Sequence, residues 1–351
     1  MPSDTDFSPE KIRALKRDNP DKRARDLCED AGMSEAQLVA AHVGETATRI
    51  AAHPDGIVGQ AHQLGEVMAL TRNISCVHEK VGVYDGYHSG NHACMVLSED
   101  IDLRIFPGHW KHAFALEEPT AKGLRRSIQV FDSAGDAVHK IYMRDGSDED
   151  GWSRLLETLR DADQSDSLRV TKRVPAEVPK GDIEKADILR KEWKRMTDTH
   201  QFMRLTSKLK MNRLGAYRMA GEPFVRALAT DAVNQMLHAV QEKSTEMMIF
   251  TGNKGCIQIH SGPLHRLMAA GPWQNVMDPR FNLHLRLDHI AEVWAVDKPT
   301  QRGNAVSVEA FAADGALIFQ VFGVGKEGRD SRPAWQEIVA GLPGLSETEH
   351  A

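Results

Sequence analysis

The feature that most constrains the fold of this chain is an internal repeat. The segment EVMALTRNISCVHEKVG (66–82) aligns without a gap with EMMIFTGNKGCIQIHSG (246–262), which begins 180 residues later. The same offset aligns DLRIFPGHWKHAFALEEPT (102–120) with NLHLRLDHIAEVWAVDKPT (282–300). A constant period over this distance predicts two copies of one structural unit in tandem.

The two copies are expected to form separate domains joined by a short linker. Proline and charged residues dominate VTKRVPAEVPKGD (170–182), a composition typical of linkers. We therefore predict an N-terminal repeat over residues 1–170, a linker over 171–182 and a C-terminal repeat over 183–351. A chain of 351 residues, of which 41% are hydrophobic, is long enough to bury two cores.

Hydrophobic alternation predicts antiparallel sheets in both copies. In NLHLRL (282–287) each leucine follows a polar residue, as a half-buried strand requires. AVSVEAFAADGALIFQVFG (305–323) contains two β-rich runs around the turn dipeptide Asp314-Gly315, which is a hairpin signal, and residues 127–143 have the same pattern. With local hairpins and no regular βαβ alternation, the predicted fold class is α+β: a tandem duplication in which each half is an antiparallel β-sheet flanked by helices.

Helix boundaries are also marked in both copies. Ser34 followed by Gln37 forms a capping-box pattern, with Gly44 as the expected stop. Asn212 is the corresponding N-cap in the second copy, with Gly221 as its stop, at an offset of 178 rather than 180. Each copy is further expected to close with a helix, around WSRLLETLRD (152–161) and PAWQEIVAGL (333–342).

Composition excludes several classes of protein. The formal charge of −6 argues against a nonspecific grip on nucleic-acid backbone. The polar, acidic start MPSDTDFSPEKI lacks the features of a secretory signal, and no apolar run approaches the length of a membrane span. We therefore expect a cytoplasmic protein without membrane insertion. Four scattered cysteines are too few for a disulfide framework and are expected to be reduced and packed.

A histidine lies at the start of a predicted helix in TDTHQFMRL (197–205). Thr199 occupies the expected N-cap position, and apolar residues follow at helical spacing. His200 would then lie in the first turn, where the positive end of the helix dipole disfavours imidazolium and leaves a lone pair free for a metal. A single histidine at such a position is more often a capping or packing residue than a ligand.

Positions at which the two copies differ are candidates for a site formed in one of them. Arg104 aligns with His284, and strand alternation places Arg104 on the face opposite Leu103 and Ile105. Either solvent or a ligand could meet its side chain there. Drift of surface residues after duplication explains such differences equally well.

One alternative function is DNA binding through a helix-turn-helix. RARDLCEDAGMSEAQLVAAHVG (23–44) has the spacing of that motif, with Gly32 near the turn. The would-be recognition helix, SEAQLVAAHVG, contains no lysine or arginine to meet phosphate or guanine. We therefore interpret it as a packing helix and expect no nucleic-acid partner.

A second alternative is a metal ion bound by a pair of histidines. His88 with His92, or His109 with His112, have possible ligand spacings. The first pair lies in a loop-like stretch, the second lacks nearby carboxylate or cysteine partners, and nothing marks a complete ligand set. The sequence also lacks a glycine-rich dinucleotide fingerprint.

Several of these features occur together in one known family. They are the tandem repeat, DLRIF (102–106) with a tryptophan soon after it, TDTH (197–200), NRLGAYR (212–218), KPT (298–300) and FQVFG (319–323). In these motifs, and over nearly its whole length, the chain resembles the bacterial cytoplasmic haem-utilisation proteins called hemin-degrading factors. The resemblance implies two similar halves, each an antiparallel sheet with helices, and one haem bound in a cleft involving both.

The resemblance also implies roles for individual residues around the haem iron. His200 would be the proximal iron ligand, and Arg104 would lie on the distal side. Phe106, together with the methionines that crowd the second half of the chain, would stack on the apolar haem face. A distal arginine could hold water, hydroxide or bound dioxygen by charge-assisted hydrogen bonds.

At the haem edge, the resemblance implies that Arg213, Lys298 and Gln320 meet the propionates or the rim of the ring. The chain departs from the family pattern in FGVGKEG (322–328), where Gly325 stands in place of an expected arginine. Lys326 follows directly, but a lysine cannot reproduce the bidentate fork of arginine.

The function implied is intracellular haem binding with oxidative haem degradation and iron release, dependent on an external electron donor. A non-enzymatic haem chaperone that delivers haem to a separate haem oxygenase is implied equally well. Haem itself, as ligand or substrate, is the expected partner, together with a haem oxygenase or a haem importer.

Overall fold

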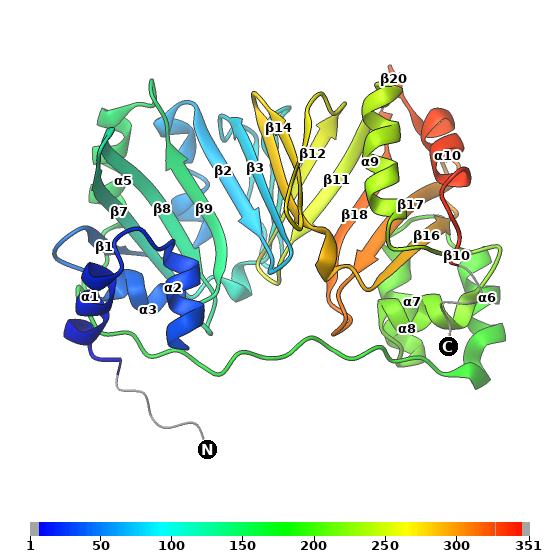
Figure 1. Ribbon diagram of the computed structural model, residues 1–351, viewed down its shortest axis with the longest axis horizontal. Helices are drawn as coiled ribbons and strands as arrows, with labels where there is room; N and C mark the ends of the chain where they lie inside the picture. The colour runs from blue at the N-terminus through cyan, green and yellow to red at the C-terminus, as the bar shows by residue number, and fades with distance from the viewer. Residues whose placement is uncertain (1–6, 327, 346–351) are drawn as a thin grey trace. The chain divides into compact units, whose positions relative to one another are not determined.

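The computed structural model describes residues 7–326 and 328–345, which form two compact units (Figure 1). The N-terminal unit comprises the described residues of Met1–Arg72, Glu79–Val174 and Gly252–Gln258. The C-terminal unit comprises those of Asn73–His78, Pro175–Thr251 and Ile259–Ala351. Each unit therefore contains one short segment from the other half of the sequence. Strands β3 (Cys76–Gly82) and β12 (Cys256–Gly262) each contribute residues to both units.

The N-terminal unit is built on antiparallel strands. Five of them pair in the order β1 (Ala47–Ile50), β7 (His112–Thr120), β8 (Gly123–Phe131), β9 (Ala137–Met143) and β2 (Val67–Arg72). A second antiparallel set consists of β4 (Tyr87–His88), β5 (Cys94–Leu97) and β6 (Asp102–Ile105).

Helices cover the strands of this unit. They are α1 (Pro9–Asp18), α2 (Ala24–Ala31), α3 (Glu35–Ala40), α4 (Pro54–Ile57) and α5 (Glu149–Leu159), with short 3-10 turns at Ala61–Leu64 and Pro107–His109. Trp152, Leu155 and Leu159 of α5 are buried in the main core, as their spacing along one helix face requires. Helix α3 packs on the rings of Phe114 and Phe131 in a smaller core.

The C-terminal unit repeats this plan. Its main strands pair antiparallel in the order β10 (Val225–Leu228), β16 (Glu292–Lys298), β17 (Ala305–Phe311), β18 (Leu317–Gly323) and β11 (Met247–Gly252). A second set consists of β13 (Leu267–Ala270), β14 (Trp273–Asp278) and β15 (Phe281–Arg286), and a short hairpin of β19 (Gly325–Lys326) and β20 (Arg329–Asp330) follows.

Two groups of helices cover opposite faces of the main C-terminal strands. They are α6 (Ala186–Lys194), α7 (Gln201–Leu209) and α8 (Arg213–Ala220) on one face, and α9 (Ala232–Glu242) and α10 (Arg332–Ala340) on the other, with short 3-10 turns at Ile183–Lys185 and Leu287–His289 (Figure 1). The alternation of β16 explains both layers: Val293 and Ala295 belong to the core under α9 and α10, and Val296 to the core under α6–α8.

Most local predictions are confirmed. Ser34 and Gln37 form a complete capping box at α3, and the side chain of Asn212 accepts the backbone N–H of Gly215 at the start of α8. The predicted hairpins are β8–β9 and β17–β18, and the closing helices are α5 and α10. The predicted stop at Gly44 is wrong, because α3 already ends at Ala40 and further turns follow it.

All four cysteines are free and buried, in agreement with the expectation that they are reduced and packed. Burial raises the pKa of both Cys76 and Cys256 to about 12, so neither thiol is an accessible nucleophile. None of the helices in the described part of the chain is both long and apolar enough to span a bilayer.

Candidate functional site

The loop before α7 places His200 differently from the prediction. Helix α7 begins at Gln201, so the N-cap residue is His200 and not Thr199. The side chain of Asp198 explains this shift. Its Oδ1 accepts the backbone N–H of His200 at 2.7 Å and forms a turn over residues 198–200, so the helix begins one residue later than expected. The Thr199 carbonyl accepts the N–H of Phe202 at 3.2 Å.

The imidazole of His200 is exposed and oriented. Its Nδ1 lies 2.7 Å from Oδ1 of Asp198, and 95% of the side chain is exposed. A carboxylate can only accept, so Nδ1 must carry the proton and Nε2 of the neutral ring keeps its lone pair. The backbone N–H of His200 and then its ring lower the pKa of Asp198, which keeps the carboxylate ionised. A histidine held this way is a typical metal ligand with a carboxylate behind it.

The His200 loop is tied to the turn between β16 and β17. The N–H of Gln301 donates to the carbonyl of Thr197 at 3.0 Å. The side chain of Gln201 bonds Thr197 from the other side, accepting its N–H at 2.9 Å. Residues 300–304, and Arg302 among them, therefore lie beside the loop that carries His200.

A partly exposed apolar surface covers one face of β11 and β18. Met248 pairs with Phe322 and Phe250 with Gln320 in the strand register, and all four side chains are half-buried. The rings of Phe250 and Phe322 lie 5.3 Å apart, edge to face. On α7, Met203 is 54% exposed, and its sulfur lies 3.6 Å from Nη2 of Arg213. An apolar surface of this kind suits a flat hydrophobic ligand.

The predicted edge residues Arg213 and Lys298 meet inside the protein. Lys298 Nζ donates to Glu309 Oε1 at 2.8 Å, and Arg213 donates to Glu309 Oε2 at 2.9 Å. The hydroxyl of Tyr217 donates to the same carboxylate at 2.8 Å. Lys298 is 2% exposed and Glu309 0%, so this is a buried ion cluster. Glu309 therefore binds both cations, although its single negative charge offsets only one of their two positive charges.

Electrostatics inside this cluster favour the ionised carboxylate. Burial alone would raise the pKa of Glu309, but the charges of Lys298 and Arg213 outweigh burial and lower it to about 2. Sequence reasoning missed Glu309, although a single acid in the apolar strand AVSVEAF was a usable signal. Gln320 lies opposite Glu309 in the strand register and remains half-buried at the rim of the cluster.

In the N-terminal unit, Arg104 lies as strand alternation predicts. Leu103 and Ile105 are fully buried, whereas Arg104 is half-buried on the opposite face of β6 and forms an ion pair with Asp102. Phe106 follows the strand, is also half-buried, and donates its N–H to the carbonyl of Gly255 at 3.0 Å. Arg104 and Phe106 are therefore both accessible in this unit.

The two alternative sites gain no structural support. Within residues 7–326 and 328–345, no three His, Cys, Asp or Glu side chains are placed to hold a metal ion together. Helix α3, the would-be recognition helix, is six residues long and buries Ala36, Leu38, Val39 and Ala40. Its one acidic residue, Glu35, is ion-paired with Lys140 at 2.7 Å. Helix α3 contains no basic residue and therefore presents no basic face to a DNA groove.

Comparison with known proteins gives a consistent family. The model of the haemin-degrading HemS.ChuX domain matches twice, over residues 32–159 and 210–342. The hemin transport protein HmuS of Yersinia pestis is 38% identical over 329 residues, which is 93% of this chain and 94% of HmuS.

Solved structures agree with this. The holo form of PhuS, a heme-binding protein from Pseudomonas aeruginosa, is 40% identical with a TM-score of 0.91 and covers 96% of this chain and 100% of that one. ChuS of Escherichia coli O157:H7, described as a heme degrading enzyme, is 33% identical with a TM-score of 0.86 and the same coverage.

Proposed function

The chain belongs to the family of the haemin-degrading HemS.ChuX domain, and we propose that it binds haem with the imidazole of His200 as the iron ligand. The observation that carries the proposal is the exposed His200 ring, whose Nδ1 is held by Asp198 and whose Nε2 is free to bind iron. The name of the P. aeruginosa relative, a heme-binding protein, supports haem as the bound molecule.

Residues around His200 fit the rest of such a ligand. The half-buried side chains of Met248, Phe250 and Phe322 offer apolar area to a porphyrin face. Gln320 offers an amide at the border of this surface. For Arg213 and Lys298 we propose positioning roles, because their charges bind Glu309 and fix α8 against β16 and β17.

The further step that we propose is oxidative degradation of the bound haem with release of iron. Bound haem would supply a redox-active iron and an oxidisable ring, and an external reductant would supply electrons. For Arg104, with Phe106 beside it, we propose the role that the resemblance implies: its guanidinium would donate charge-assisted hydrogen bonds to an oxygen ligand when haem is bound. The description of ChuS as a heme degrading enzyme supports the proposed degradation of haem.

One observation favours a second candidate, the delivery of intact haem to an oxygenase or from an importer. Because the side chain of His200 is 95% exposed, a receiving protein could reach the ligand directly. The relative from Y. pestis is called a hemin transport protein, in line with this alternative.

A single experiment separates the two candidates. The protein is loaded with one equivalent of haem without oxygen, and reductant and oxygen are then added in the presence of catalase, which removes free peroxide. Loss of the haem absorption band with a bilin-like product and chelatable iron identifies degradation. An unchanged band, followed by transfer to an apo-oxygenase in a second step, identifies delivery.

The roles of the two iron-side residues are tested by substitution. His200→Ala should shift the haem spectrum and weaken binding; an unaltered spectrum and affinity would remove His200 from its role. Arg104→Ala should change the water or hydroxide ligand of the iron with little change in apo stability, because a partly exposed pair with Asp102 contributes about 0–1 kcal/mol. A large loss of apo stability would contradict this assignment.

A further inference from the structure

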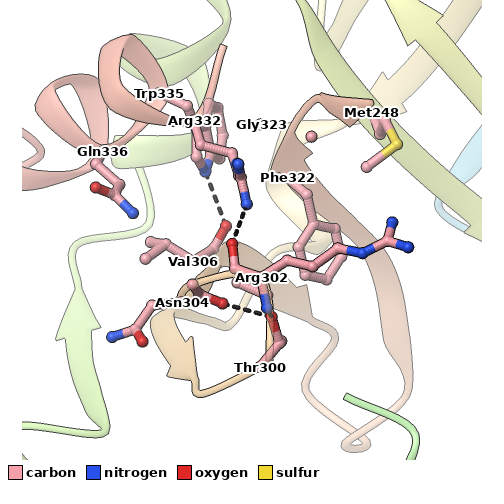
Figure 2. Close-up of a pocket in the computed structure, with 13 residues that line it drawn as sticks. Met248, Thr300, Arg302, Asn304, Val306, Phe322, Gly323, Arg332, Trp335 and Gln336 are labelled. Atoms are coloured by element: carbon pink, nitrogen blue, oxygen red, sulfur yellow. Dashed lines mark hydrogen bonds between the residues drawn. The ribbon is translucent and has the colours of Figure 1, made fainter. Parts of the chain in front are cut away.

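A small cavity lies beside the partly exposed apolar surface of the C-terminal unit (Figure 2). Its volume is about 180 Å³, and its lining includes Met248, Arg302, Phe322, Gly325 and Arg332. Sites that enclose a whole drug-sized molecule have volumes of roughly 300–1,000 Å³. The cavity can therefore hold a substituent of a large flat ligand but not its ring.

Two guanidinium groups line this cavity, and they differ in availability. Arg332 donates to both carboxylate oxygens of Asp330, at 2.8 and 2.6 Å. It also donates to the backbone carbonyl of Arg302 at 2.5 Å (Figure 2). The Arg302 side chain is exposed and extends across Phe322 toward Met248. Within the described residues, no acceptor engages the guanidinium of Arg302. Its five N–H donors are available to a ligand.

The glycine at position 325 explains how Arg332 reaches this place. A Cβ atom at Gly325 would lie 3.0 Å from Cδ and 3.1 Å from Nε of Arg332. The arginine of α10 therefore occupies the space that a side chain at position 325 would need. Asp330 fixes it there, so that Arg332 forms a charged wall and Arg302 the open binding group.

The charges around the cavity favour an anion. Arg302 and Arg332 contribute two positive charges, and Lys326 is exposed next to Gly325. Among the described residues, Asp330 and Asp297 contact the lining, and both have partners: Asp330 binds Arg332, and Asp297 accepts the side-chain amide of Asn304 at 2.9 Å. The partner-free guanidinium of Arg302 matches the fork geometry of a carboxylate.

Resting on the proposed function, we propose that Arg302 binds one propionate carboxylate of haem in this cavity. Three observations place it there. The turn that carries Arg302 is hydrogen-bonded to the His200 loop through Gln301 and Thr197. Phe322 and Met248 join the cavity to the apolar surface, and the volume fits a side arm. Arg302 thereby takes the anionic end of a ligand whose apolar face lies against β11 and β18.

The test compares haem with its dimethyl ester, which has the same ring and iron but no carboxylates. Affinities of the full-length protein for both are measured by optical titration in the same dilute detergent. Arg302→Gln should weaken haem binding about tenfold, the range expected for a lost charge-assisted hydrogen bond, and should leave ester binding unchanged. Arg302→Lys should fall in between, because a lysine keeps the charge without the fork.

A matched control removes an equally exposed arginine elsewhere. Arg266 lies in the same unit, before β13, and does not line the cavity. Arg266→Gln should bind both compounds like the parent protein. Equal haem affinity of Arg302→Gln and the parent would overturn the assignment, as would an equal loss for haem and ester. If the parent protein bound neither compound, the proposed function itself would fail, which is a distinct outcome.

Discussion

The carboxylate of Asp198 holds both the backbone N–H and the ring Nδ1 of His200, each at 2.7 Å. One side chain thus sets the start of α7 and the direction of the imidazole. Asp198→Asn should weaken haem binding about 10- to 100-fold, the usual effect of removing an anionic partner from a metal-bound histidine. The measurement is an optical titration, with the iron–histidine stretching frequency as a second readout.

The control for this prediction is Asp187→Asn, which neutralises an exposed acid on α6. It should leave both the affinity and the stretching frequency unchanged. The orienting role of Asp198 would be refuted by an Asp198→Asn protein whose haem affinity and frequency equal those of the parent.

The buried cluster around Glu309 predicts a large stability effect. Glu309→Gln leaves the buried ammonium of Lys298 without its counter-charge, which costs about 3–5 kcal/mol of unfolding free energy. Adding Lys298→Met should recover part of this loss, because the double variant no longer buries an unpaired charge at position 298. Urea unfolding at pH 7 measures both effects, and a double variant that lost the sum of the single effects would contradict the pairing.

The same carboxylate predicts a pH dependence. The pKa of Glu309 falls from 4.5 to about 2 on folding, so ionised Glu309 stabilises the fold above pH 4.5. This contribution, roughly 3 kcal/mol, is lost as pH falls from 4.5 to 2, since the unfolded chain takes up the proton first. Glu309→Gln should therefore show a flatter decline of stability in that window than the parent protein.

Sequence periodicity was sufficient for most of the fold but not for the role of every residue. The faces of β6 and the hairpin β17–β18 follow from alternation, because the contacts that fix them are local. The burial of Lys298 depends on Glu309 and on Tyr217. Tyr217 lies on helix α8, 81 residues before Lys298 in the sequence. A motif such as KPT cannot reveal that its lysine is buried and paired with a carboxylate.

The composition of the two units also lay beyond sequence reasoning. Segments 73–78 and 252–258 each belong to the unit of the opposite half. Both have the same pattern, Asn followed three residues later by Cys, and that pattern fits either copy equally. The side chains of Asn73 and Asn253 accept the N–H groups of the cysteines in both loops, so local chemistry does not distinguish them.

A histidine buried in the N-terminal unit gives another pH prediction. Nδ1 of His139 lies 2.8 Å from the hydroxyl of Thr71, and its Nε2 lies 2.5 Å from the hydroxyl of Tyr84. Burial lowers the pKa of His139 from 6.5 to about 3, so the folded protein keeps it neutral while the unfolded chain binds a proton. Stability should fall by about 1.4 kcal/mol for each pH unit between 6.5 and about 3.

The second copy suggests the variant that tests this. Phe319 and Leu264 stand at the positions of His139 and Tyr84, 180 residues later. The double variant His139→Phe with Tyr84→Phe removes both partners of one bond and should abolish this slope between pH 6.5 and 5. The control His92→Gln alters an exposed histidine and should retain the slope of stability against pH. An unchanged slope in the double variant would assign the pH dependence to other groups.

The differences between the copies predict one haem per chain. The left-handed residues Gly32 and Lys210 end α2 and α7 at equivalent places, 178 residues apart. At this offset Lys22 stands where the second copy has His200, and Glu35 where it has Arg213. An ammonium cannot ligate iron while protonated, and Lys22 is ion-paired with Asp30. The first copy therefore has no histidine at the position equivalent to the proposed iron ligand.

An optical titration of the parent protein should show a break at one equivalent of haem, and His200→Ala should remove the spectrum of that site. Lys22→Ala is the matched control, because it changes the equivalent position of the first copy and should leave the break and the spectrum unchanged. A second equivalent that bound with its own spectrum and persisted in His200→Ala would show a ligand outside the His200 loop. That result would contradict a site formed in one copy alone.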